Sequence, residues 1–173
     1  MIRWFLGQIF AIIAVAIIDI ALIKSLPFGL AFFQTLPIAL VFVYLLGNIR
    51  LALVWAIGGA LLLEAFTFGS YGFHLIGLVA SVAIISLLFK RIITNHSLYS
   101  VSVVAMASTL VYDISLLIKQ SVDGLPITWG NFLENEGLTL LYSILLSLAS
   151  FYIINNITRR LRPVFLAKKN YQL

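Results

Sequence analysis

Three carboxylates lie inside apolar stretches of this sequence, where an ionised side chain is costly. Asp19 closes the run "FAIIAVAIID", Glu64 follows "GGALLL", and Asp113 follows "STLVY". Carboxylates inside an apolar helix usually face protein or water, and they can move protons, line a solute cavity or hydrogen-bond a partner. The choice among these roles depends on how the helices place the three groups.

Small residues surround two of these acids. Glu64 follows Ala56 and Ala60 at intervals of four, so the three share one helix face. Asp19 lies on a more apolar face. A small and polar stripe leads to Asp113: Ser102, Ala105 and Thr109. Small residues let helices approach closely. Each acid is therefore either a structural hydrogen-bonding group near the membrane surface or part of a shared outward cavity or partner groove.

Two further residues are candidates for binding. His74 is either a polar tip at the membrane surface or, with Glu64 and Asp113, part of a metal site, but no ligand spacing supports a metal. Trp129 either anchors a loop at the interface or caps an outer cavity. No nucleotide-binding, zinc-protease or nucleophile motif is present, so we expect neither enzyme activity nor a cofactor.

The composition indicates an integral membrane protein of one domain. The chain has 173 residues, of which 62% are hydrophobic and 10% charged, whereas soluble domains are nearer half apolar and a quarter charged. The absence of cysteine excludes disulfides and iron–sulfur clusters. The net charge of +5 is spread over helix ends and one tail, which favours a membrane surface over nucleic acid.

Six apolar stretches approach the length of about 20 residues that a spanning helix needs. They cover residues 4–23, 28–46, 51–66, 73–93, 98–118 and 138–157. Pro37 should kink the second stretch or start a new helical piece. We expect an all-α bundle of six transmembrane helices over residues 1–157, followed by a basic tail over residues 158–173.

The basic residues predict the orientation, because cytoplasmic flanks are rich in Lys and Arg. With the N-terminus inside, nine basic residues are cytoplasmic and two are outside. The inside set is Arg3, Arg50, Lys90, Arg91, Arg159, Arg160, Arg162, Lys168 and Lys169; the outside set is Lys24 and Lys119. Both termini are thus predicted to be cytoplasmic, with the last five basic residues near anionic lipid headgroups.

This orientation also sorts the acids. Asp19, Glu64 and Asp113 all come late in spans that run outward, so they should share the outer third of the membrane. Glu134 and Glu136 are assigned to an outer loop between Lys119 and Gly137. Because the three intramembrane acids share one depth, a proton relay across the membrane is not expected.

Three segments carry a resemblance to a known family. They read "LPIALVFVYLLGNIR", "GGALLLEAFTFGSYGFHLIGLVASV" and "ASTLVYDISLLIKQ". In order, spacing and span number they resemble the MreD family of bacterial rod shape-determining membrane proteins. Glu64 stands where that family usually has Asp, and Tyr71-Gly72 stands for a Leu-Gly pair. The family is similar in fold to the substrate-binding S-components of ECF vitamin transporters.

The resemblance implies a non-enzymatic scaffold of the peptidoglycan elongation machinery in the bacterial cytoplasmic membrane. Its partner would be a single-span MreC-like protein, held in an outer-leaflet groove. The residues expected at that groove are Glu64, Asp113, Asp19, His74 and Trp129. The alternative is the solute-binding S-component of a transporter, with a small polar or cationic molecule in the same groove.

Overall fold

The structure is a computed structural model that describes residues 2–23, 34–67, 72–91, 98–125 and 129–169. These residues form helices and no strand, which confirms the predicted all-α class. The helices are α1 (Ile2–Ile17), continued by a π-helical segment η1 (Ile18–Ile23), then α2 (Thr35–Leu46), α3 (Ile49–Phe66), α4 (Phe73–Arg91), α5 (Leu98–Val122) and α6 (Trp129–Lys169).

Four helical stretches are long and apolar enough to cross a membrane. They are Ile49–Phe66, Phe73–Arg91, Leu98–Val122 and Glu136–Ile153. The apolar stretches Leu6–Ala21 and Thr35–Leu46 are shorter. The part of the expected second span that precedes Gln34 lies outside the described residues. The chain is thus a membrane protein by length and composition of its helices.

Pro37 lies in the first turn of α2 and does not kink a long helix. The first backbone N–H groups of a helix have no partner within the helix, so a proline is tolerated there. Two effects are expected of Pro37, a kink or the start of a new helix. The structure shows the second, because α2 begins at Thr35.

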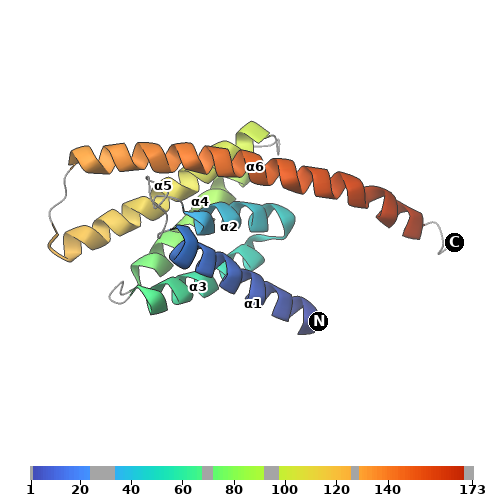
Figure 1. The fold of residues 1–173 in the computed structure, drawn as a ribbon, viewed down its shortest axis with the longest axis horizontal. Coiled ribbons are helices and arrows are strands. Elements are labelled where there is room, and N and C mark those ends of the chain that lie inside the picture. The colour runs from blue at the N-terminus through green and yellow to red at the C-terminus, as the bar shows by residue number, and fades with distance from the viewer. Residues whose placement is uncertain (1, 24–33, 68–71, 92–97, 126–128, 170–173) are drawn as a thin grey trace.

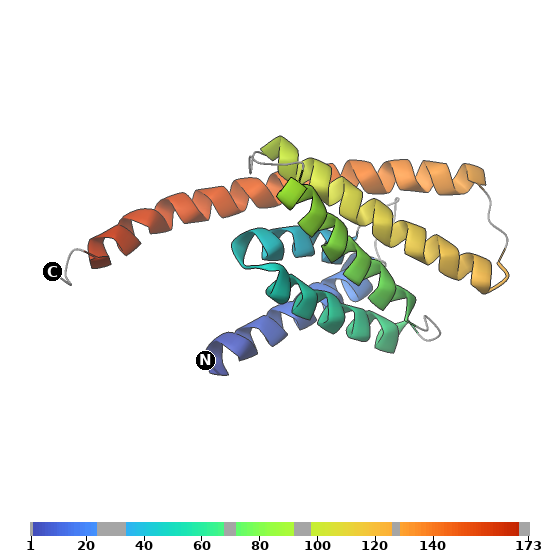
Figure 2. The ribbon, with the colours of Figure 1, turned by 180° about the vertical axis from the view of Figure 1, so that it is seen from behind.

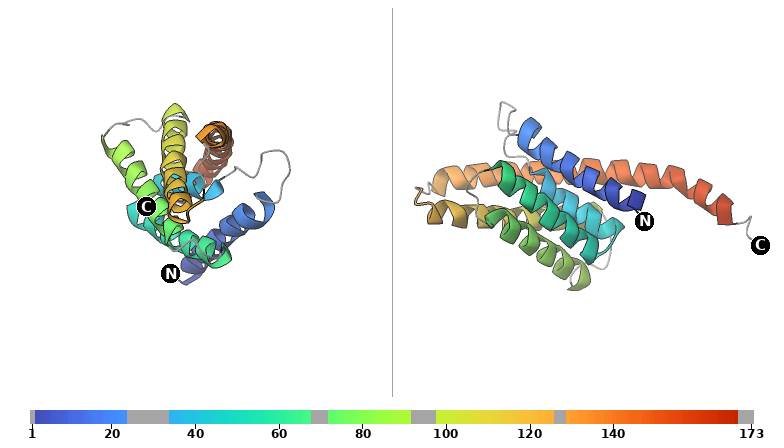
Figure 3. Two further views of the ribbon diagram at one scale, coloured as in Figure 1. Left: turned by 90° about the vertical axis from the view of Figure 1, so that its left-hand side faces the viewer. Right: turned by 90° about the horizontal axis from the view of Figure 1, so that it is seen from below.

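Helix α2 lies at the centre of the bundle, and α1 and α6 flank it on two sides (Figure 3). The core is a cluster of fully buried aliphatic side chains. It includes Leu36, Leu40 and Val41 of α2, Leu63 of α3, Leu78, Val82 and Ile85 of α4, and Val101 and Val104 of α5. Burial of large aliphatic side chains from four helices fixes how these helices pack against one another.

Glycines set the closest helix approaches in this core. A Cβ atom built on Gly59 would lie 2.8 Å from the Leu36 side chain, so α3 packs directly on α2. A Cβ atom on Gly77 would lie 2.2 Å from Ser115 Oγ, so α4 meets α5 with no room for a side chain. Small residues at such crossings let membrane helices exchange close van der Waals contacts.

Helix α6 is longer at both ends than the predicted sixth span. It runs for 41 residues, about 60 Å at 1.5 Å per residue, and projects beyond the other helices (Figure 1). It includes Glu134 and Glu136, so their assignment to an outer loop is wrong. It also continues to Lys169, through most of the segment predicted as a tail.

The first and last described residues lie at the same end of the bundle. Figures 1 and 2 show the start of α1 and the end of α6 on one side, with the end of α5 and the start of α6 on the other. The side chains of Arg159, Arg160, Arg162, Lys168 and Lys169 lie outside the described part, so their contact with lipid headgroups stays a prediction.

Candidate polar site at one end of the bundle

The predicted acids gather at the end of the bundle opposite the chain termini. Asp19 lies in η1 just after α1, Glu64 is near the end of α3, and Asp113 is in the second half of α5. These helices run in the same direction, so residues late in each reach the same end (Figure 1). His74 joins them from the first turn of α4, which runs the other way.

Asp19 caps the first turn of α2. Its Oδ1 atom accepts hydrogen bonds from the backbone N–H and the hydroxyl group of Thr35, both at 3.0 Å. The residue before the helix, Gln34, makes no side-chain capping bond of its own. A carboxylate at a helix N-terminus accepts a hydrogen bond from an N–H group that has no partner within the helix. It also interacts favourably with the positive end of the helix dipole. Asp19 is buried, and these bonds tie η1 to α2.

Glu64 has the same role at α4. Its Oε1 atom accepts a hydrogen bond from the backbone N–H of Leu75 at 3.1 Å, in the first turn of that helix. The side chain is half-buried. Glu64 therefore holds the end of α3 against the start of α4, which follows Gly72. At φ +85°, Gly72 has a backbone conformation that favours glycine.

His74 has a hydrogen-bonding partner at each ring nitrogen. Nδ1 lies 2.7 Å from the Tyr112 hydroxyl group on α5, and Nε2 lies 3.2 Å from Thr67 Oγ1 after α3. The His74 and Tyr112 rings also stack, with centroids 5.9 Å apart. His74 is thus a buried connector of α3, α4 and α5. The described residues contain no group of three His, Asp or Glu side chains that could hold a metal ion.

Asp113 meets two residues that are not among the candidates predicted from the sequence. Its Oδ1 atom accepts a hydrogen bond from the amide of Gln34, which precedes α2. The carboxyl group of Glu136, in the second turn of α6, lies within hydrogen-bonding reach of the Asp113 carboxyl group. We call Gln34, Asp113 and Glu136 the acceptor cluster.

Each member of the acceptor cluster has a buried oxygen atom without a hydrogen-bond partner among the described residues. The atoms are Gln34 Oε1, Asp113 Oδ2 and Glu136 Oε1. Two ionised carboxylates and an amide oxygen only accept, so the three atoms do not satisfy one another unless Asp113 and Glu136 share a proton. Buried acceptors without a donor are costly. The cluster needs a shared proton, a cation or hydrogen-bond donors from outside the chain.

A ladder of polar contacts joins α5 to α6 and leads to this cluster. Ser147 Oγ donates to Ser102 Oγ at 3.1 Å, and Ser143 Oγ donates to Thr109 Oγ1 at 3.3 Å. The Asp113–Glu136 pair extends the ladder toward the end of the bundle. The polar stripe that leads to Asp113 therefore faces α6.

The sequence held a signal for Glu136. Thr139, Ser143 and Ser147 follow it at helical spacing and are buried, so all four share one face of α6. The glycines and proline of "GLPITWGNFLENEG" indicated a loop instead. Gln34 had no comparable signal, because its bond to Asp113 joins residues 79 positions apart. Trp129 is the first residue of α6, and its side chain lies outside the described part.

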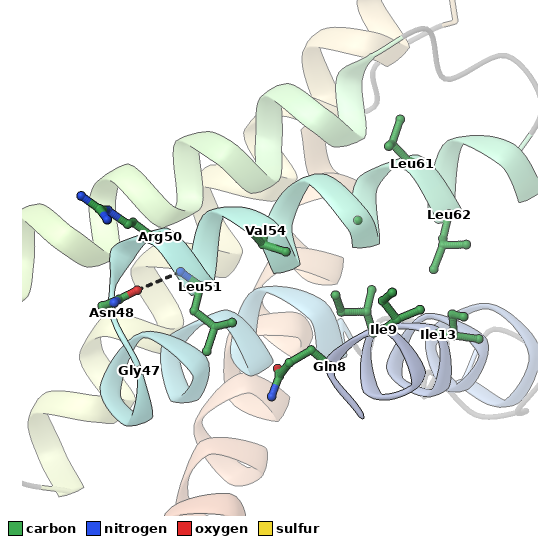
Figure 4. Close-up of a pocket in the computed structure, with 12 residues that line it drawn as sticks. Gln8, Ile9, Ile13, Gly47, Asn48, Arg50, Leu51, Val54, Leu61 and Leu62 are labelled. Atoms are coloured by element: carbon green, nitrogen blue, oxygen red, sulfur yellow. Dashed lines mark hydrogen bonds between the residues drawn. The ribbon is translucent and has the colours of Figure 1, made fainter. Parts of the chain in front are cut away.

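A second feature is an apolar groove between α1 and α3, of about 720 Å³ (Figure 4). Its lining is Gln8, Ile9, Ile12, Ile13, Gly47, Asn48, Arg50, Leu51, Val54, Gly58, Leu61 and Leu62. None of the predicted site residues is among them, so this α1–α3 groove differs from the groove expected from the sequence.

Comparisons with known proteins give no match. A scan against protein-family models, a search of curated proteins and a search of solved structures each find nothing similar to this chain.

Proposed function

We propose that this chain is a non-enzymatic scaffold of the bacterial cell-shape and peptidoglycan elongation machinery, and that it binds a single-span MreC-like partner. The observation that carries the proposal is the acceptor cluster, whose three buried oxygen atoms lack donors within the described chain. The resemblance of the three quoted segments to the MreD family supplies the class of partner.

A partner at the outer end would supply those donors. Gln34 and Glu136 are only partly buried, although their unpaired oxygen atoms are buried. A bound chain would therefore have to shift these side chains to bring its N–H, hydroxyl or ammonium groups to the oxygen atoms. Hydrogen bonds to charged acceptors contribute about 1.5–3 kcal/mol, more than neutral ones. In a membrane, where apolar packing discriminates poorly between helices, such bonds give specificity.

The proposed topology has six spans with both termini in the cytoplasm of a bacterial cell. The excess of Lys and Arg at the end that holds the chain termini supports this orientation. The acceptor cluster and the capping acids then face the periplasmic side. A single-span partner then meets the cluster in the outer leaflet, with the outer part of its own membrane helix.

Co-purification tests this proposal. Glu136→Leu removes one acceptor, and we expect capture of a tagged MreC-like protein from native membranes to fall about tenfold. Asp123→Leu is the matched control, because Asp123 is an exposed acid at the same end that pairs with Lys119 at 3.4 Å. Equal capture by the parent chain, Glu136→Leu and Asp113→Asn would reject the scaffold role.

The acceptor cluster also favours a second candidate, the solute-binding subunit of a transporter. Three acceptors, from the residue before α2 and from α5 and α6, suit a small solute with an ammonium group or several donors. Native mass spectrometry of the purified chain separates the two functions. A small bound mass that Glu136→Leu abolishes supports solute binding, whereas an empty chain that retains a membrane protein partner supports the scaffold.

A further inference from the structure

The α1–α3 groove has one polar end and a long apolar wall. Gln8, Asn48 and Arg50 lie toward the start of α3, and the other lining side chains are aliphatic (Figure 4). On its wall, the side chain of Val54 is 50% exposed and that of Leu61 is 56% exposed, so the groove is open to the outside of the bundle.

The polar end of the groove offers mainly hydrogen-bond donors. Gln8 Oε1 accepts from Trp55 Nε1 at 2.7 Å, and Asn48 Oδ1 accepts from the backbone N–H of Leu51 at 3.0 Å. Each amide therefore retains its NH₂ group, while the exposed Arg50 side chain only donates. None of the described lining residues is acidic. The first turn of α3 adds the positive end of a helix dipole. This end of the groove is complementary to an anion.

The apolar wall has the depth of one membrane leaflet. Leu51 and Leu62 are eleven residues apart on α3, or about 16 Å along the helix axis. The hydrocarbon core of a bilayer is about 30 Å thick, so half of it is about 15 Å. A partner helix that crosses the membrane would need a groove of twice this length. A lipid acyl chain needs one leaflet only.

We infer that the α1–α3 groove binds an anionic glycerophospholipid from the leaflet on the side of the chain termini. Its acyl chain lies along Leu51, Val54 and Leu61, and its phosphate meets the donors of Arg50 and Asn48. The site is separate from the acceptor cluster, which lies at the other end of the bundle. The lipid-binding inference therefore does not depend on the proposed scaffold role.

Native mass spectrometry tests the headgroup. The full chain is reconstituted in nanodiscs of phosphatidylglycerol and phosphatidylcholine in equal amounts, and the lipids that remain bound on release are counted. We expect phosphatidylglycerol to be retained preferentially, and Arg50→Gln to lower that preference about tenfold. Arg91→Gln is the control, because Arg91 is an exposed cation at the same end, on α4 and outside the groove lining. Equal losses in both variants, or no preference in the parent chain, would overturn the inference.

A second pair of variants tests the acyl chain. Val54→Trp fills the groove, and we expect it to reduce retention of both lipids about tenfold. Ile57→Trp adds the same side chain to an exposed position of α3 outside the lining and should leave retention unchanged. A second copy of the chain or another protein bound at the groove, lost in Val54→Trp but not in Ile57→Trp, would contradict the lipid assignment.

Discussion

The position of Asp19 inside an apolar run is explained by the backbone of another helix. The first N–H groups of helix α2 have no partner within the helix, and the side chains of the turn that follows, Leu36 to Ile38, are buried. Asp19 supplies an acceptor for Thr35 at two atoms. The energetic cost of placing the acid there is offset by a donor that would otherwise be unsatisfied.

This role predicts a difference between two substitutions of Asp19. Asp19→Ala removes the acceptor, and we expect the free energy of unfolding to fall by about 1–2 kcal/mol. Asp19→Asn keeps an oxygen atom at Oδ1 and should retain most of the stability. Denaturant unfolding in detergent micelles measures both. Equal destabilisation by Ala and Asn would show that the charge, and not the hydrogen bond to Thr35, is what matters.

Sequence reasoning placed the candidate residues better than it assigned their contacts. Alternating helix directions put Asp19, Glu64 and Asp113 at one end, and the structure brings them to that end. The bond between Gln34 and Asp113 and the cap of Asp19 on Thr35 depend on how α2 docks in the bundle. No local pattern in the chain encodes that docking, so these contacts could not be predicted.

At the scale of the helices, hydrophobic length predicted α3, α4 and α5 well and the ends of α6 poorly. In the sequence, the first three are bounded by segments with glycine, asparagine or other polar residues, where the apolar pattern stops. Helix α6 continues past both ends of its apolar window, Glu136–Ile153, because helical structure does not require apolar residues. A hydropathy pattern reports the membrane-embedded part of a helix and not the whole helix.

The close crossing of α4 and α5 gives a prediction at this scale. Gly77→Ala places a methyl group 2.2 Å from Ser115 Oγ and 2.9 Å from Tyr112 Cδ2, so the two helices must separate. We expect a loss of about 1–3 kcal/mol in unfolding free energy, measured as a lower midpoint of denaturant unfolding in detergent.

Gly7→Ala on α1 is the control for this crossing, because nothing lies within 4 Å of the added atom. Alanine is a better helix former than glycine, so this variant should be as stable as the parent chain or slightly more stable. If Gly77→Ala has the same unfolding free energy as Gly7→Ala, α4 and α5 pack less closely than the structure shows.

For the whole molecule, the arrangement combines a compact centre with two exposed flanks. Helix α2 packs against α3, α4 and α5 near the centre of the bundle, while α1 and α6 lie on its flanks (Figure 3) and expose several apolar side chains. Phe10 on α1 is 74% exposed and Leu145 on α6 is 53% exposed. Such faces are stable in lipid, which agrees with the membrane character of the four long helices.

Helices α1 and α2 are short for membrane spans. Whether they cross the membrane is therefore the part of the proposed topology that most needs a test. If α1 crosses, Lys24, which follows η1 in the sequence, reaches the outer surface. If α1 and α2 only dip into the bilayer, Lys24 stays on the cytoplasmic side. The chain has no cysteine, so a single introduced thiol reports on one position without a background.

We expect Lys24→Cys to react with a membrane-impermeant maleimide on intact bacterial spheroplasts. Asp123→Cys, in the exposed turn after α5, is the positive control for the outer side. Arg91→Cys, at the exposed end of α4, should react only after the membrane is permeabilised. Labelling of Lys24→Cys that requires permeabilisation, with both controls as expected, would reduce the bundle to four spans. Because the structure places Asp19 and η1 at the same end of the bundle as Glu64 and Asp113, that result would also contradict the packing of α1 against the other helices.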